Sequence, residues 1–141
     1  ADMDEASAPG HRRAVVDALA VHRPERVGAR PLGAAHDVAE ADRIFASHGE
    51  WMKGHPREGD VALLDYTISK GPELSNPMDP NSEPTGKTIF VIDEYYESPA
   101  GIARHWKDGM DNWPDMSAAM AWSAKGTVAT LHNGTAVQAL W

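Results

Sequence analysis

Two segments of the chain carry apolar residues in the pattern of buried strands, and a polar segment separates them. Residues 61–69 are apolar at first and then alternate between apolar and polar side chains, which predicts a strand. Residues 87–96 contain the unbroken apolar run 89–92, which is typical of a strand covered on both faces. Residues 71–86 contain four prolines and no periodicity, so we expect a long loop that forms a lid or contacts a partner. Two strands joined by a loop rather than a helix are antiparallel neighbours.

Helical patterns predict two helices before these strands and two after them. The first covers residues 12–22, and the second covers residues 37–53, with Asp37 as its N-cap and Glu40 as the capping-box partner. Ser98 and Pro99 start the third helix, because serine is a good N-cap and proline at the first helical position has no amide hydrogen to lose. Residues 113–124 form the fourth helix. The second helix should bury one stripe of side chains: Val38, Ala41, Phe45, His48 and Met52.

Three weaker strand signals complete the predicted order of elements. Residues 27–32 are a weak strand candidate, and residues 126–131 and 135–140 are two short strands around the turn dipeptide Asn133-Gly134. We therefore expect an α+β domain over residues 37–141, preceded by a tail, a helix and a connection over residues 1–36. Helices on one face leave the other face of an apolar sheet bare, so a second copy of the chain is expected to cover it as a homodimer.

Composition narrows the range of partners and chemistry. A chain of 141 residues fits one domain. Its formal net charge of −8 argues against nucleic acid and anionic membranes as partners, and no apolar run reaches the length of a membrane span, so a cytoplasmic location is expected. The chain has no cysteine, which excludes disulfides, thiolate catalysis and cysteine-ligated metals. The seven histidines show no H-x-H, H-x-x-x-H or H-E-x-x-H spacing, so no metal site is predicted from the sequence.

Two segments resemble the antibiotic-biosynthesis monooxygenase family: REGDVALLDYTIS at residues 57–69 and KTIFVIDEYYESPAGIARHW at residues 87–106. The resemblance covers roughly residues 37–132. It implies a ferredoxin-like βαββαβ antiparallel sheet with helices on one face, paired into a dimeric α+β barrel. It also implies a pocket between sheet and helices for electron-rich aromatic substrates, quinols or haem. The chain departs from the family pattern in its extra N-terminal helix, its weak first strand and its long loop.

His105 is the candidate catalytic residue, because it lies two helical turns after the strand-to-helix junction at the edge of an apolar face. An imidazole there could accept a phenolic proton or bind haem iron, and the alternative is a boundary histidine without chemistry. Beside it, His48, Tyr66 and Tyr96 are candidates for binding substrate oxygens, and Trp51 and Trp106 for the walls of the pocket. Each of these has an ordinary structural alternative as a core residue.

Carboxylates within the predicted strands need partners, because burial of a charge is costly. Asp65, Asp93 and Glu94 are therefore expected either to orient a histidine or a substrate hydroxyl, or to lie at the rim of the sheet. His55, next to Pro56, is expected to complement the dipole at a helix end.

These features lead to one preferred function and two alternatives. The preferred function is a cofactor-independent monooxygenase acting on a phenol, a quinol or an anthrone, since such substrates can pass an electron to dioxygen once deprotonated. One alternative is a non-catalytic dimer that binds a small ligand or responds to stress. The other alternative is a protein that binds or degrades haem through His105.

Overall fold

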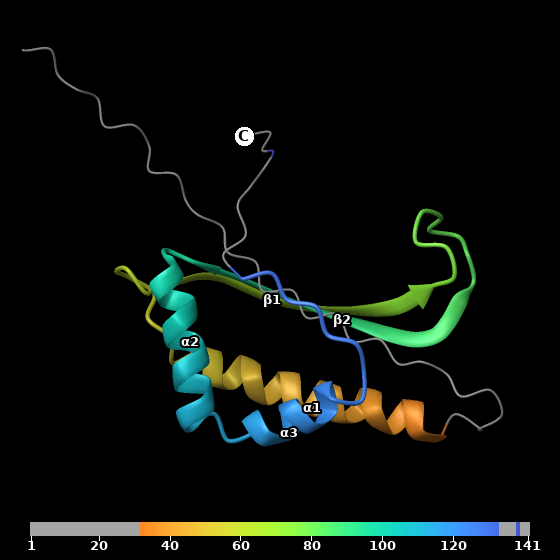
Figure 1. Ribbon diagram of the computed structural model, residues 1–141, viewed down its shortest axis with the longest axis horizontal. Helices are drawn as coiled ribbons and strands as arrows, with labels where there is room; N and C mark the ends of the chain where they lie inside the picture. Colours follow the sequence, from red (N-terminus) through yellow and green to blue (C-terminus); the bar gives the residue numbers. More distant parts are fainter. Residues whose placement is uncertain (1–31, 133–137, 139–141) are drawn as a thin grey trace, which may run out of the picture.

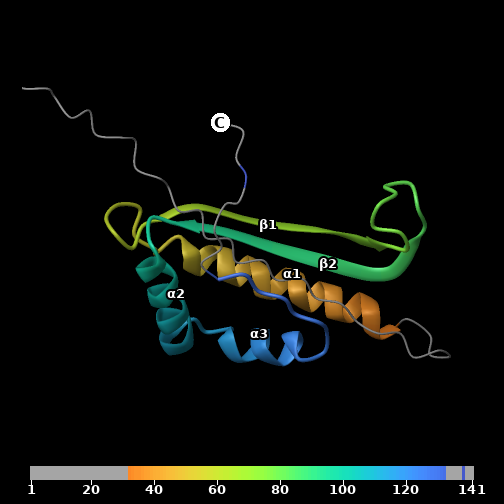
Figure 2. The same cartoon turned by 45° about the horizontal axis from the view of Figure 1, so that its top comes forward.

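The computed structural model describes residues 32–132 and residue 138. In this part of the chain the elements follow the order α1 (Leu32–Met52), β1 (Leu63–Leu74), β2 (Pro84–Tyr96), α2 (Pro99–Asn112) and α3 (Met116–Ser123). The two strands form one layer, and the three helices lie on one face of it (Figure 1). Figure 2 shows the same two layers from a second direction. The predicted α+β class is confirmed, whereas the described residues contain a two-stranded sheet and not a full βαββαβ unit.

The hairpin is antiparallel, as predicted, and its register turns one set of β2 side chains toward the helices. Ile68 pairs with Ile92 and Tyr66 pairs with Glu94. Because side chains alternate along a strand, the β2 residues that share the helix-facing side are the following: Phe90, Ile92, Glu94 and Tyr96. The sheet therefore presents an apolar surface that ends, toward α2, in a carboxylate and a phenol.

The predicted loop over residues 71–86 is too long, because both strands extend into it. Pro72 pairs with Thr88 and Leu74 with Pro84, so the connection covers only residues 75–83. Both prolines lie where a strand can do without an amide hydrogen. Pro84 is the first residue of its strand, and Pro72 lies beside a register shift.

The core forms where α1 packs against the sheet and α3. Ala41 and Ile44 of α1 are fully buried, and Phe45 contacts the rings of Phe90 and Trp122 at centroid distances of 5.2 and 5.6 Å. Of the stripe predicted for this helix, Ala41, Phe45, His48 and Met52 are buried. These contacts fix the side of α1 that faces the sheet, and therefore the direction of His48.

The expected cap of α1 at Asp37 is wrong, because the helix begins at Leu32 and Asp37 lies within it. Alanines at positions 34 and 35 favour continuation of the helix toward the N-terminus. Asp37 instead connects the helix to the end of α3. Its carbonyl oxygen accepts a hydrogen bond of 2.8 Å from the indole of Trp122, and its carboxylate lies 3.1 Å from Nζ of Lys125.

The predicted start of α2 is confirmed. The Ser98 hydroxyl accepts a hydrogen bond of 3.2 Å from the amide of Ala100, and it donates one of 2.7 Å to the carbonyl of Asp60. Gly101 then allows the helix to pass directly over Tyr96, since a Cβ atom there would lie 2.7 Å from Cδ1 of that ring. This close approach sets the height of α2 above the sheet.

The predictions after α2 are only partly confirmed. Trp113 is the C-cap of α2 rather than the start of the next helix, which begins at Met116. Residues 126–131 do not form the predicted strand, and Val128 and Leu131 are exposed, so no packed face favours an extended strand there. The predicted helix at residues 12–22, nearly all of the weak strand at residues 27–32, and the strand at residues 135–140 (residue 138 apart) lie outside the described residues.

No helix in the described part of the chain combines the length and the apolar character that crossing a bilayer requires.

Candidate functional site

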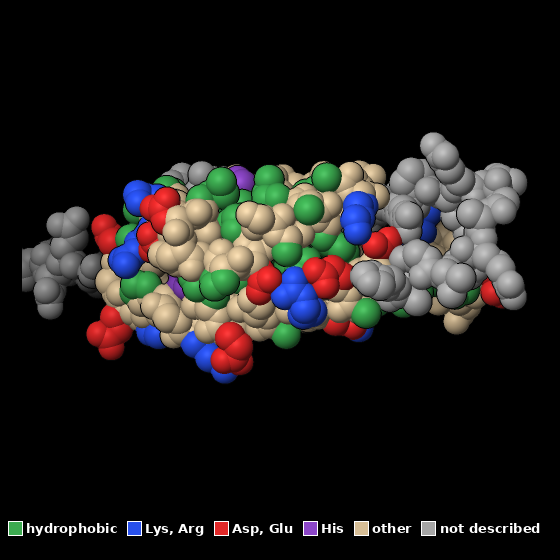
Figure 3. Space-filling model, turned by 90° about the horizontal axis from the view of Figure 1, so that it is seen from below, with side chains coloured by type: hydrophobic (Ala, Val, Ile, Leu, Met, Phe, Trp, Pro, Cys, Tyr) green, Lys and Arg blue, Asp and Glu red, His purple; other side chains and the backbone are tan. Residues whose placement is uncertain are grey.

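Three buried ionisable side chains meet between the sheet and the helices. His48 of α1, Glu94 of β2 and His105 of α2 are 5, 2 and 7% exposed, and we call them the buried centre. One nitrogen or oxygen atom of each residue lies within 4.8 Å of the others. Seen from the helical side, histidine appears only as small patches between other side chains (Figure 3). The buried centre is therefore an internal feature of the fold, built from three separate elements.

Each residue of the buried centre also contacts a polar side chain that does not belong to the centre. Nδ1 of His48 lies 2.8 Å from the hydroxyl of Tyr66, and the hydroxyl of Tyr96 donates a hydrogen bond of 2.9 Å to Oε2 of Glu94. Nδ1 of His105 lies 3.2 Å from Nε2 of His55. These contacts involve Nδ1 of both centre histidines. The other ring nitrogen of His105, Nε2, lies 3.7 Å from Oε2 of Glu94.

Burial keeps the two centre histidines neutral. It lowers the pKa of His48 to about 4, with a further lowering from His55. It lowers the pKa of His105 to about 3, and the neighbouring histidines, His48 first, add to this effect. Each imidazole therefore has one unprotonated nitrogen at neutral pH, which can accept a hydrogen bond or bind a cation. Burial and the charge of Glu94 also raise the pKa of Tyr66, so its hydroxyl keeps its proton.

Aromatic rings surround His105. The rings of Trp51, His48, Trp106 and Tyr96 lie 5.3, 5.5, 5.8 and 6.0 Å from its ring, measured between centroids. Tyr66 joins the group through His48, at a ring distance of 5.5 Å. The structure thus brings together all the residues that the sequence singled out for the site: His105, His48, Trp51, Tyr66, Tyr96 and Trp106. Nε1 of Trp106 is buried there without a hydrogen-bond acceptor among the described residues.

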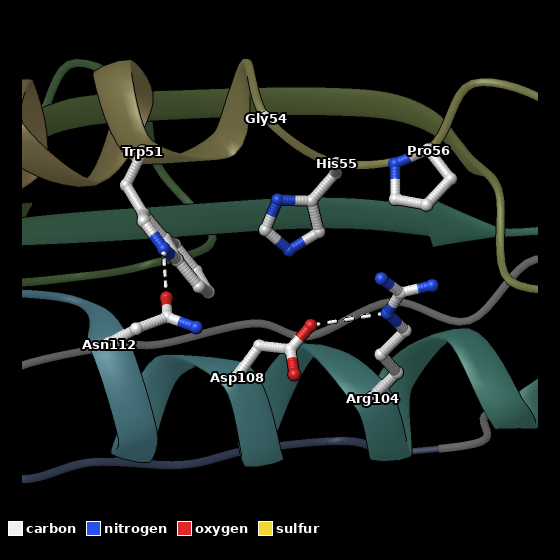
Figure 4. Close-up of a pocket in the computed structure, with 7 residues that line it drawn as sticks. All are labelled: Trp51, Gly54, His55, Pro56, Arg104, Asp108 and Asn112. Atoms are coloured by element: carbon white, nitrogen blue, oxygen red, sulfur yellow. Dashed lines mark hydrogen bonds and ion pairs between the residues drawn. The ribbon is translucent and has the colours of Figure 1, made fainter.

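A pocket of about 180 Å³ opens next to the buried centre, between the end of α1 and the side of α2 that faces it. Its lining residues are shown in Figure 4: Trp51, Gly54, His55, Pro56, Arg104, Asp108 and Asn112. The indole of Trp51 donates a hydrogen bond of 2.8 Å to Asn112, and Nε of Arg104 lies 3.1 Å from Asp108. The His55 ring lies between Trp51 and Pro56 in this view, so it lines the pocket and also contacts His105.

Sequence reasoning included Glu94 among the candidate residues and missed the role of His55. Glu94 was a candidate for orienting a histidine, and strand alternation places it on the same face as Tyr96, Ile92 and Phe90. His55 was expected only to complement a helix end. It follows α1 in a turn, and no periodicity connects that turn with α2, so its contact with His105 depends on how the two helices pack.

Comparisons of the chain with protein-family models, with curated proteins and with solved structures found no match. The resemblance to the antibiotic-biosynthesis monooxygenase family therefore stays a prediction based on the residues quoted above.

Proposed function

We propose that this protein is a monooxygenase for an electron-rich aromatic molecule such as a phenol, a quinol or an anthrone. One observation carries the proposal. The residues predicted for such a site come from α1, β1, β2 and α2, and their side chains meet around His105. Separate core roles for a histidine, two tyrosines and two tryptophans would not require them to share one place.

The reaction needs no external reductant when the substrate supplies the electrons. For an anthrone, the ring methylene loses two hydrogens and gains one oxygen atom from dioxygen, while the second oxygen atom leaves as water. For a phenol, a ring carbon gains one oxygen atom and loses its hydrogen, the hydroxyl loses a second hydrogen, and the products are a quinone and water. The protein has to bind the substrate, orient it and help to remove its proton.

The pocket beside His55 is the proposed place for the substrate, because rings fill the space around His105 itself. Trp51 forms one wall of that pocket and also packs on His105. His55 is the imidazole that lines this pocket, and its Nε2 lies 3.2 Å from Nδ1 of His105 behind it. Proton transfer to His105 would be unfavourable in isolation, since each unit of lowered pKa costs about 1.4 kcal/mol. The carboxylate of Glu94, at 3.7 Å, would stabilise the imidazolium that forms.

The proposed fold and assembly include more than the two-stranded hairpin that the structure describes. We propose that the chain adopts the ferredoxin-like βαββαβ unit that the family resemblance implies, and that two chains pair through their sheets. The helix-averted side of β2 carries Ile89, Val91, Asp93 and Tyr95, all half-buried. Sedimentation at micromolar concentration tests the assembly: a dimer supports it, and a folded monomer contradicts it.

Oxygen consumption tests the reaction. The wild-type protein should consume dioxygen with at least one member of a panel of quinols and anthrones. His105→Ala should lose this activity, whereas the exposed control His132→Gln should keep it. No oxygen consumption across the panel would favour the ligand-binding alternative. A Soret band on addition of haemin would favour the haem alternative, which the enclosure of His105 by four rings makes less favourable.

A further inference from the structure

We propose that His48, Glu94 and His105 bind one divalent first-row transition-metal ion. The inference goes beyond the proposed reaction and does not rest on it, because the geometry of three side chains carries it. Two imidazoles and one carboxylate form the ligand set of non-haem iron oxygenases and of several zinc enzymes. Imidazole nitrogen and carboxylate oxygen together favour Fe²⁺, Co²⁺ and Zn²⁺ over Ca²⁺ and Mg²⁺, which prefer oxygen ligands.

The distances fit an ion after small side-chain movements. Metal–ligand bonds of about 2.1 Å place ligand atoms roughly 3 to 3.5 Å apart. In the buried centre, Nε2 of His105 and Oε2 of Glu94 are 3.7 Å apart, and no pair of candidate ligand atoms exceeds 4.8 Å. Small rotations of these side chains, without a change of rotamer, would bring the ligand atoms to the spacing that an ion requires.

The outer contacts resemble those of established metal sites. A metal-bound histidine usually donates its other N–H to a fixed acceptor, which holds the ring in place and selects its tautomer. Here Tyr66 lies at Nδ1 of His48, His55 lies at Nδ1 of His105, and Tyr96 donates to Glu94. The two histidines are therefore each held at Nδ1, whereas Tyr96 holds Glu94 at Oε2, the same oxygen that faces His105.

The contact between His55 and His105 bears on which nitrogen of His105 lacks a proton. Nε2 of His55 lies 3.2 Å from Nδ1 of His105, and which of the two donates depends on the tautomers of the rings. In the tautomer that the proposed site requires, Nδ1 of His105 donates to Nε2 of His55. This leaves the unprotonated Nε2 of His105 directed at the carboxylate of Glu94.

A lone pair facing a carboxylate at this distance is unfavourable unless a cation or a proton lies between them. A divalent ion there would bring positive charge next to a carboxylate that is only 2% exposed. Three protein ligands also leave a coordination position that a water molecule can fill. In the proposed monooxygenase, such an ion would take over from His105 as the activating group.

Cobalt titration tests the site. The full chain is first dialysed against a chelator, then titrated with Co²⁺ without oxygen, and the visible d–d absorption and the bound metal are measured. We expect one ion per chain, and at least a tenfold loss of affinity in the near-isosteric variant Glu94→Gln and in His105→Gln. The exposed-histidine control His132→Gln should bind as the wild type does. Far-UV circular dichroism establishes that each variant is folded, and His48→Gln provides a third ligand variant if one fails to fold.

Two results would overturn the inference. One is a folded wild-type protein that retains no cobalt after desalting. The other is unchanged binding in the folded ligand variants, which would place the ion elsewhere. Because the assay contains no substrate, it separates the metal site from the reaction: a protein that binds cobalt but consumes no oxygen contradicts only the proposed monooxygenase, and the reverse result contradicts only the metal.

Discussion

Nε2 of His105 on α2 lies 3.7 Å from Oε2 of Glu94 on β2, with both side chains almost completely buried. This relationship connects the helical layer to the sheet through two ionisable groups rather than through apolar contacts. Its chemistry depends on whether the nitrogen carries a proton. If it does not, the pair is a partial metal site; if it does, the pair is a short-range ion pair or a weak hydrogen bond.

Nitrogen NMR of the imidazoles distinguishes these states. The proposed metal site requires an unprotonated Nε2 on His105, so in the metal-free protein at neutral pH we expect its proton on Nδ1, which lies 3.2 Å from Nε2 of His55. Long-range proton–nitrogen correlations report the tautomer of each ring directly. A proton on Nε2 of His105 would contradict this tautomer and would assign the contact with Glu94 to an internal pair.

Stability should fall as the pH is lowered below about 6.5. The folded-state pKa values of His48 and His105, about 4 and about 3, lie below the value of 6.5 expected in the unfolded chain. The unfolded state therefore binds more protons between these limits, and protonation favours unfolding. Between pH 7.5 and pH 5 we expect a loss of roughly 2 kcal/mol per buried histidine.

Urea unfolding at the two pH values, with chelator present, measures this loss. Replacement of His48 by glutamine should reduce the pH dependence by about half, although it also changes the stability at pH 7.5. A stability that is equal at both pH values would show that these histidines titrate normally in the folded protein.

Removal of the Tyr66 hydroxyl should weaken the buried centre. In Tyr66→Phe, Nδ1 of His48 loses its partner at 2.8 Å, and a buried polar atom left unsatisfied costs about 1–3 kcal/mol. Loss of an outer partner typically lowers metal affinity by about 10- to 100-fold. The matched control is Tyr95→Phe, since Tyr95 lies on β2 with its side chain on the opposite face of the sheet. Equal unfolding midpoints and equal cobalt affinities for both variants would contradict the role given to Tyr66.

Close packing at Gly101 should make that position sensitive to a single added methyl group. Its Cβ would lie 2.7 Å from Cδ1 and 3.0 Å from Cβ of Tyr96, so α2 or the tyrosine must shift. We expect Gly101→Ala to lower the free energy of unfolding by about 1–3 kcal/mol. In Gly71→Ala the new Cβ atom has no other atom within 4 Å, so the midpoint of thermal unfolding should stay close to that of the wild type. Comparable midpoints for the two alanine variants would show that the sheet and α2 have more space between them.

The sequence was sufficient where local signals decide the structure. The Ser98-Pro99 pair marks the start of α2 through capping chemistry that involves only neighbouring residues. Alternation likewise placed Tyr66, Glu94 and Tyr96 on definite faces of their strands. Because several candidate residues occupy such elements, their faces could be predicted from the sequence, whereas their grouping around His105 was expected from the family resemblance.

Tertiary contacts decided the features that sequence reasoning missed. The hairpin extends to Leu74 and Pro84 because pairing of the opposite strand outweighs the low strand preference of proline and glycine. Residues 126–131 have strand-like composition but no packed face in the described part of the chain. The metal-ligand geometry joins residues from three elements, so no short histidine spacing could reveal it.

Anomalous diffraction from crystals soaked with Zn²⁺ or Co²⁺ tests the central claim most directly. The account predicts one peak inside the fold, with bonds of about 2.1 Å to an imidazole nitrogen of His48, a carboxylate oxygen of Glu94 and Nε2 of His105. An interior without a peak, while ions occupy only exposed histidines or carboxylates, would contradict it.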